Sequence, residues 1–117
     1  MVVRQGELFW IDAGEPRGSE PGFRRPHVVV QGDALNRSQI RSVIVCPLTS
    51  NLSRARIIGN VLLKAGEANL PQPSVVIVSQ IATFDRGELK EYIGTLSLER
   101  LHQIWSGIRL SLEPSPR

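Results

Sequence analysis

The chain has 117 residues, with 14 basic and 11 acidic side chains and a formal net charge of +3. This length suits one domain, 1–117, with a single hydrophobic core. Cys46 is the only cysteine, which excludes an internal disulfide and a zinc site built on several cysteines. No apolar run approaches the roughly 20 residues of a membrane helix, and the N-terminus lacks a signal-peptide layout, so we expect a cytoplasmic protein with no membrane partner.

Branched apolar segments alternate with turn residues and predict a mostly β fold. We expect strands over residues 8–12, 25–31, 42–49, 61–63, 74–78 and 81–84. A long loop over residues 13–24 joins the first two strands. Asp33 is expected to cap a short helical turn that runs through Asn36. Cys46 lies within an apolar strand and is expected in the core.

One long helix is predicted over residues 98–112, with Ser97 as its N-cap. An apolar stripe recurs every three or four residues and should face the core: Leu98, Leu101, Trp105, Ile108 and Leu112. Trp105 is therefore interpreted as a core residue. Residues 113–117 contain two prolines and are expected to form a loose tail. Several short strands and one closing helix indicate a small, mostly β barrel with helical additions.

Arginine dominates the positive charge, and it is concentrated in the first half of the chain. Twelve of the 14 basic residues are arginine, and the segment from Arg17 to Arg56 holds seven arginines but only two acids, Glu20 and Asp33. The guanidinium group is always charged and can donate two hydrogen bonds to one phosphate. This segment therefore predicts a polyanionic partner such as RNA or DNA.

The candidate functional residues gather where the long loop meets the second strand. Gly18, Pro21 and Gly22 favour turns, and Arg24 and Arg25 follow just before the apolar strand. A charged group at such a junction has a fixed origin and an open approach. Sequence spacing alone also allows a solvated pair of arginines beside an ordinary turn.

Several common kinds of chemistry find no support in the sequence. His27 and His102 lie in no H-x-x-x-H motif or carboxylate cluster, so neither a metal nor another cofactor is expected. A phosphate-binding G-x-x-x-x-G-K-[ST] loop and a G-x-S-x-G elbow are also missing. The remaining candidate is a phosphate-directed site, in which arginine neutralises developing charge and a hydroxyl group donates a hydrogen bond.

Four short motifs in this order resemble the MazF/PemK family of toxins over nearly the whole chain. They are the segments 6–10 (GELFW), 18–26 (GSEPGFRRP), 47–50 (PLTS) and 80–83 (QIAT). The resemblance implies an SH3-like barrel of the MazF/CcdB type, usually paired as a homodimer. It also implies a sequence-specific endoribonuclease that cleaves single-stranded RNA without a metal ion and is held by a cognate acidic, MazE-like antitoxin.

The resemblance also implies a set of site residues. Arg25 matches the family's catalytic arginine, and Thr49 matches its catalytic threonine. Ser19 and Glu20 match loop residues at the border of the site. Around them, we expect substrate contacts from Arg17, Ser19, Glu20, Phe23, Arg24, His27, Ser50, Asn51 and Gln80.

This sequence departs from the family pattern at Pro21, His27 and Ala82, where relatives often have Gln, an aliphatic residue and Arg. An unperturbed histidine has a pKa of about 6.5, so His27 is a candidate to transfer a proton, which Arg25 cannot do. The alternative interpretation, which we favour, is a partly buried strand histidine bonded to a neighbour.

Two other functions remain open at this stage. A CcdB-like gyrase-binding toxin shares the fold but has no nuclease activity, and its terminal Trp-Gly-Ile group is interrupted here within residues 105–108. A non-catalytic RNA-binding module needs exposed aromatic residues for base stacking, and Phe23 is the one plausible candidate.

Overall fold

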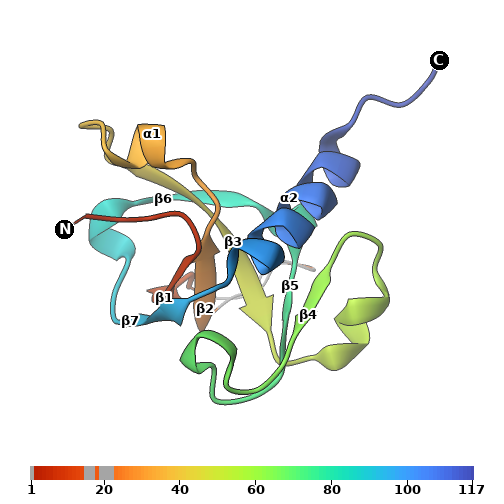
Figure 1. Ribbon diagram of the computed structural model, residues 1–117, viewed down its shortest axis with the longest axis horizontal. Helices are drawn as coiled ribbons and strands as arrows, with labels where there is room; N and C mark the ends of the chain where they lie inside the picture. The colour runs from red at the N-terminus through yellow and green to blue at the C-terminus, as the bar shows by residue number, and fades with distance from the viewer. Residues whose placement is uncertain (1, 15–17, 19–22) are drawn as a thin grey trace.

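A computed structural model describes residues 2–14, 18 and 23–117 (Figure 1). Its strands are β1 (Glu7–Asp12), β2 (Arg24–Val29), β3 (Ser42–Thr49), β4 (Val61–Leu63), β5 (Ser74–Val76), β6 (Ala82–Asp85) and β7 (Tyr92–Thr95). Two α-helices, α1 (Asp33–Asn36) and α2 (Leu98–Leu112), accompany four 3₁₀ turns, η1 (Leu52–Arg56), η2 (Glu67–Asn69), η3 (Val78–Gln80) and η4 (Arg86–Glu88). No helix within the described ranges is long and apolar enough to cross a membrane.

The strands form one curled sheet in the order β4-β5-β3-β2-β1-β7, and β6 also pairs with β3. Strand β3 pairs with β2 along one edge. Along its other edge, β3 pairs first with β6, over Ser42–Val45, and then with β5, at Leu48 and Thr49. This change of partner along one strand lets the sheet bend into a half-barrel, with α2 lying across it (Figure 1). The predicted mostly β, barrel-like fold with a C-terminal helix is confirmed.

Two hydrophobic clusters lie on opposite faces of the central strands. Val28, Cys46 and Leu48 belong to the cluster that packs against α2. Val29 and Val45 belong to the other cluster, beneath β1 and β6. Because alternate residues of a strand face opposite sides, β2 and β3 are buried on both faces along much of their length. Burial of Cys46 is confirmed, and it raises the pKa of the thiol to about 12.

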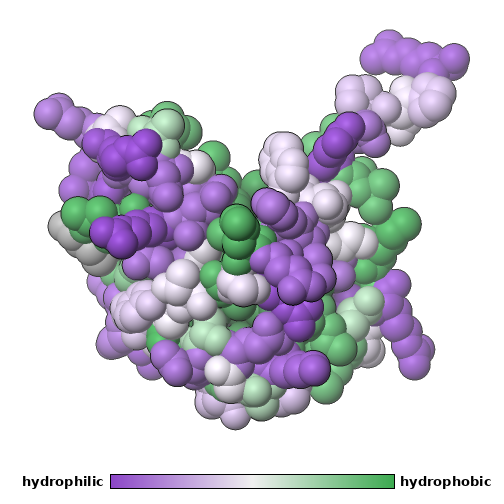
Figure 2. Space-filling model, viewed as in Figure 1, coloured by the Kyte–Doolittle hydropathy of each residue, from purple (hydrophilic) through white to green (hydrophobic). Residues whose placement is uncertain are grey.

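Helix α2 has the predicted bounds, but the predicted apolar stripe is wrong. The helix buries Ile104, Gly107 and Ile108, whereas Leu98, Trp105 and Leu112 are more than half exposed. Hydrophobic side chains therefore reach the surface along and beside α2 (Figure 2). Ile108 is the one predicted stripe residue that is fully buried, and the interpretation of Trp105 as core is corrected.

A close backbone contact explains this rotation of α2. A Cβ atom on Gly107 would lie 2.1 Å from the carbonyl oxygen of Gly59, so the helix approaches this loop through a position that has no side chain. That contact turns Ile104 inward and leaves Trp105, one residue further along, facing outward.

Several predicted boundaries also shift. The second strand is Arg24–Val29 rather than 25–31, the fifth ends at Val76, and the sixth is Ala82–Asp85. Gly32, not Asp33, occupies the N-cap position of α1. The Asp33 carboxylate instead accepts hydrogen bonds from the backbone N–H of Gln5 and the side chain of Asn36, which lower the pKa of Asp33.

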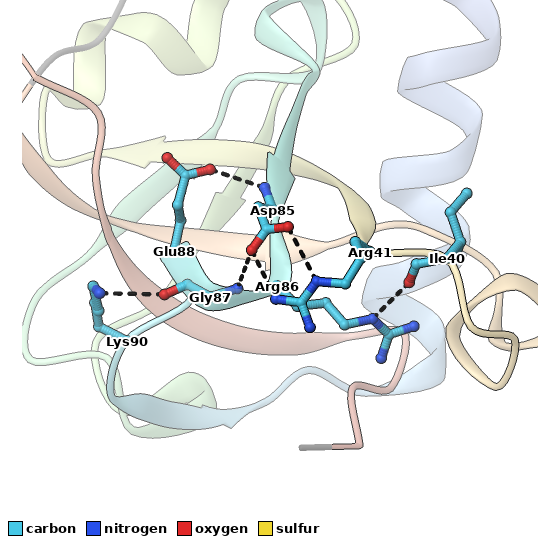
Figure 3. Close-up of polar contacts among 7 residues, drawn as sticks. All are labelled: Ile40, Arg41, Asp85, Arg86, Gly87, Glu88 and Lys90. Carbon is cyan, nitrogen blue, oxygen red and sulfur yellow. Dashed lines mark hydrogen bonds and ion pairs between the residues drawn. The ribbon is translucent and has the colours of Figure 1, made fainter.

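Strand β7 was not predicted from the sequence, and a compact turn precedes it. In that turn, Asp85 and Glu88 form a reciprocal capping box around η4 (Figure 3). Arg41 forms an ion pair with Asp85, and Arg86 donates to the carbonyl of Ile40 (Figure 3). This cluster fixes one end of β3, at the opposite end of the strand from Thr49.

Candidate functional site

Strand pairing brings Arg25 and Thr49 together. His27 pairs with Pro47 and Val28 with Cys46 in the antiparallel ladder between β2 and β3. Two residues beyond these pairs, β2 carries Arg25 and β3 carries Thr49, and both line the same hollow. The two residues that the family resemblance implies are therefore held by two paired strands rather than by a flexible loop.

The open end of this ladder borders a hollow of about 190 Å³. It is lined by Trp10, Arg24, Arg25, Pro26, Leu48, Thr49, Ser50, Leu70, Pro71, Gln72 and Ser74. Arg25 and Thr49 are half-buried here, and Ser50 is exposed. We call this space the arginine–threonine hollow. Four of the predicted site residues thus share one concave site.

The hydroxyl group of Thr49 is oriented by the chain that follows it. The backbone N–H of Asn51 donates a 3.2 Å hydrogen bond to the Thr49 hydroxyl oxygen. An oxygen that already accepts a bond keeps its own hydrogen to donate. Thr49 can therefore donate to an anion in the hollow.

Arg24 is held by two neighbours. Its guanidinium carbon lies 4.7 Å from the centroid of the Trp10 ring, within cation–π range. Its Nη2 atom donates to the Glu91 carboxylate, which comes from the segment just before β7. A hydrogen bond from the backbone N–H of Glu91 itself lowers the pKa of that carboxyl, and the ion pair with Arg24 lowers it further.

His27 is fully buried, in contrast to the partly buried state that we favoured. It packs edge-to-face against Phe84, and its Nδ1 atom lies 3.0 Å from the carbonyl oxygen of Arg25. A carbonyl only accepts, so Nδ1 carries the proton of the neutral ring. Burial lowers the pKa of His27 to about 4, and the nearby Arg25 charge also lowers it. The interpretation of His27 as a buried residue bonded to a neighbour is therefore supported over that of a proton carrier near neutrality.

The other predicted residues are divided between different places. Gln80 and His27 line a second hollow, beside Pro47 and Phe84. Asn51 is the N-cap of η1, and its side-chain oxygen accepts from Ser53. Phe23 is 59% exposed at the end of the long loop. Arg17, Ser19 and Glu20 lie outside the described residues.

Trp10 and Gln72 border the arginine–threonine hollow and were not predicted as site residues. Trp10 was recognised only as part of a family motif, although the strand that carries it ends where the long loop begins. Gln72 lies between two prolines, and nothing in the local sequence connects it with residues 24–49. Among the described residues, no group of three or more His, Cys, Asp or Glu side chains is placed to hold a metal ion.

The sequence and the fold of this chain both match those of known proteins. Residues 4–112 match the family model of the PemK-like, MazF-like toxin of type II toxin–antitoxin systems. Endoribonuclease MazF6 of Mycobacterium tuberculosis is 38% identical over 113 residues, which span 97% of this chain and 99% of that protein. Endoribonuclease MazF of Staphylococcus saprophyticus is 32% identical over 111 residues, or 95% and 92% of the two chains.

Solved structures support the fold. A MazF crystal structure from Deinococcus radiodurans superposes with a TM-score of 0.77 at 25% identity, covering 97% of this chain and 99% of the other. A mycobacterial endoribonuclease, solved in complex with its cognate antitoxin, has the same TM-score at 23% identity, with 97% and 99% coverage. The predictions of the family and of an endoribonuclease toxin are confirmed, and the gyrase-binding alternative is not favoured. The chain belongs to the PemK-like, MazF-like toxins of type II toxin–antitoxin systems.

Proposed function

We propose that this toxin cleaves single-stranded RNA at a specific sequence, without a metal ion, and that Arg25 and Thr49 act on the scissile phosphate. The observation that carries the proposal is the meeting of these two side chains in the arginine–threonine hollow, at the end of the β2–β3 ladder. Arg25 supplies a permanent positive charge, and Thr49 supplies a hydrogen-bond donor whose oxygen is already anchored.

The reaction follows from what these groups offer. The 2′-oxygen of the RNA attacks the adjacent phosphorus, the bond from phosphorus to the 5′-oxygen breaks, and a 2′,3′-cyclic phosphate forms. One proton leaves the 2′-oxygen and one is added to the 5′-oxygen, so the net reaction neither consumes nor releases a proton. Arg25 neutralises the charge that grows on the phosphoryl oxygens, and Thr49 donates to one of them.

The roles of the remaining predicted residues are part of the same proposal. Arg24 and Ser50 line the hollow and contact the flanking nucleotides. Arg17, Ser19, Glu20 and Phe23 also contact the substrate in this proposal, and Glu20 orients an arginine. Asn51 positions Thr49 through its backbone N–H. Gln80 contacts more distant substrate at a second hollow, and the buried His27 supports the wall of that hollow.

A digestion with chemical analysis of the ends tests this proposal. The protein is incubated with a long RNA in excess EDTA, and the fragments are sequenced from both ends. We expect discrete fragments with a 2′,3′-cyclic phosphate or its opened 3′-phosphate, and a 5′-hydroxyl. Arg25→Ala should lower the rate roughly a hundredfold, as removal of one oxyanion donor does elsewhere.

Arg41→Ala is the matched control. It also removes an exposed arginine from the first half of the chain, but at the end of β3 opposite to Thr49. Fragments with 5′-phosphates, or activity that EDTA abolishes, would contradict the proposed chemistry. Equal losses in Arg25→Ala and Arg41→Ala would contradict the assignment of the site.

The cellular setting that we propose is a cytoplasmic homodimer whose RNA-binding surface an acidic, MazE-like antitoxin covers. The family description as one half of a toxin–antitoxin pair supports the antitoxin, and the arginines of the first half supply the complementary charge. Static light scattering at micromolar concentration should give twice the 13.0 kDa chain mass. A monomeric mass there would contradict the dimer without affecting the cleavage site.

A further inference from the structure

Trp10, Arg24 and Glu91 form a preassembled unit at the rim of the arginine–threonine hollow. Trp10 pairs with Pro26 across the β1–β2 ladder and Asp12 pairs with Arg24, so Trp10 and Arg24 are diagonal neighbours on one face. This register puts the Arg24 guanidinium over the indole ring, 4.7 Å from its centroid. Both residues line the hollow that holds Arg25 and Thr49.

Backbone hydrogen bonds fix the third member. The N–H of Trp10 donates to the carbonyl of Glu91 at 3.0 Å, and the N–H of Lys90 donates to the carbonyl of Trp10 at 2.8 Å. Glu91 is therefore tied to the strand that carries the indole, and its carboxylate accepts a hydrogen bond from Arg24. Pro26, which has no N–H, lies opposite Trp10 and loses no ladder bond, because both polar backbone groups of Trp10 point toward residues 90 and 91.

The unit is not explained by stability. The side chains of Arg24 and Glu91 are 54% and 68% exposed, and exposed ion pairs contribute little to folding. The arrangement nevertheless fixes a planar cation between an aromatic ring and solvent. One side of Arg24 is covered by Trp10, and the other remains accessible.

The charge of Arg24 is also already balanced. A carboxylate next to the guanidinium weakens its attraction for a second anion, so Arg24 is a poorer phosphate ligand than it would be without Glu91. A nucleobase carries no charge and stacks well on guanidinium planes and aromatic rings. It also carries N–H groups that a carboxylate such as Glu91 can accept.

We propose that the Trp10–Arg24–Glu91 unit is a base-binding subsite for a nucleotide that flanks the scissile phosphate. The base stacks on the accessible side of the Arg24 guanidinium, and Glu91 holds that guanidinium in place and accepts from the base edge. This subsite rests on the proposed function, because its substrate is the RNA whose phosphate lies between Arg25 and Thr49. It makes Arg24 a determinant of base binding rather than a backbone contact.

Removal of single bases tests the subsite. Short RNAs that contain the mapped cleavage sequence are made with an abasic nucleotide on either side of the scissile bond, and kcat/KM is measured for each. With the wild-type protein, loss of the base on one of the two sides should lower kcat/KM at least about tenfold, within the range that stacking of one base contributes. With Arg24→Ala, loss of the same base should lower kcat/KM by less than about twofold.

Two further variants separate stacking from charge and from folding. Arg24→Lys keeps the positive charge but lacks the planar group, so it should behave like Arg24→Ala toward the abasic RNA. Arg41→Ala, which breaks another exposed Arg–carboxylate pair away from the hollow, should retain the full wild-type effect of the base. Circular dichroism confirms that each variant is folded.

The possible failures are distinct. If the wild-type protein cleaves RNA with the proposed ends but the effect of the base is equal in wild type and Arg24→Ala, the subsite is overturned and the proposed function stands. If Arg24→Lys restores the wild-type effect, Arg24 acts through charge and the stacking role is overturned. If the intact RNA is not cleaved at all, the proposed function fails, and the subsite fails with it.

Discussion

The hydroxyl group of Thr49 is oriented by its neighbours in the chain. Its position is set by β3, and its oxygen accepts the N–H of Asn51 at 3.2 Å. Asn51 is in turn held as the N-cap of η1 through bonds from Ser53. The hydroxyl hydrogen is thus directed by a chain of local bonds that an isolated strand end would lack.

We expect the hydroxyl, not the size, of Thr49 to matter for cleavage. Thr49→Val keeps the shape of the side chain but removes both the donor and the acceptor, so kcat should fall roughly a hundredfold, the loss typical of one transition-state donor. Thr49→Ser keeps the hydroxyl and should lose less than about tenfold. Single-turnover cleavage of the mapped RNA measures both, and equal rates for the two variants would show that the hydroxyl does not take part.

Burial of His27 has a consequence for stability as a function of pH. Its pKa is about 4 in the folded chain and about 6.5 when unfolded, so between these values the unfolded chain takes up a proton that the native chain refuses. Stability is therefore complete above about pH 6.5 and falls as the pH drops toward 4, by up to about 3 kcal/mol. Urea denaturation at pH 7, 5.5 and 4.5 measures this slope.

His27→Val provides the control for that slope. The variant lacks the titrating ring, so its free energy of unfolding should change much less across the same pH interval. Asp33 and Glu67, whose pKa values are lowered by their hydrogen bonds, lose their contribution only at still lower pH. The rate of RNA cleavage by His27→Val should keep the wild-type dependence between pH 5.5 and 8, because His27 is neutral throughout that range.

At the scale of elements, α2 is positioned by a glycine contact and an ion pair. Gly107 lies directly against the backbone of Gly59, and Arg100 donates two hydrogen bonds to Glu67 in η2, at 2.8 and 2.9 Å. These contacts join the helix to the two loops that flank β4. They also decide which of its apolar residues reach the core.

Gly107→Ala should destabilise the protein although alanine is the better helix former. The added Cβ would lie 2.1 Å from the Gly59 carbonyl oxygen, and backbone cannot move aside as a flexible side chain does. We expect a loss of about 1–3 kcal/mol, as for overpacked cores. Gly32→Ala is the control, since nothing lies within 4 Å of its added Cβ. Thermal denaturation that gives the same Tm for both variants would contradict this contact.

At the scale of the whole molecule, folding redistributes the charge that the sequence separates. The arginines are in excess in the first half, but acids of the second half return to them: Glu91 pairs with Arg24, and Asp85 pairs with Arg41. Among the ion pairs of the described residues, none involves Arg54 or Arg56 in η1. Because η1 begins two residues after Ser50, these arginines belong to the segment that directly follows the arginine–threonine hollow in the chain.

We therefore expect Arg56 to contribute to RNA binding through charge alone. Arg56→Ala should weaken binding of a single-stranded RNA at low salt and reduce the slope of log K against log salt concentration by about 0.7, the value for one phosphate contact. Arg41→Ala should leave that slope nearly unchanged. Fluorescence anisotropy over a salt series measures both, and identical slopes for wild type and Arg56→Ala would exclude the contact.

The sequence by itself determined the elements whose signals are local. Turn residues and branched apolar runs located most of the strands. The predicted bounds of β3 and α2 are the observed ones. This is possible because strand and helix periodicities, and the Ser97 cap, are properties of neighbouring residues. The motifs also identified the family and nominated Arg25 and Thr49. No local signal marked β7, which depends on pairing with a strand more than 80 residues earlier.

Only the tertiary structure decided what lies around those residues. The rotation of α2 depends on Gly59, far from it in sequence, so the stripe that included Trp105 was assigned to the wrong side. Likewise, His27 is neutral because β6 places Phe84 against it, and Arg24 is held by Glu91, 67 residues later. Burial, pKa and pairing depend on contacts between distant segments, and a linear pattern does not carry them.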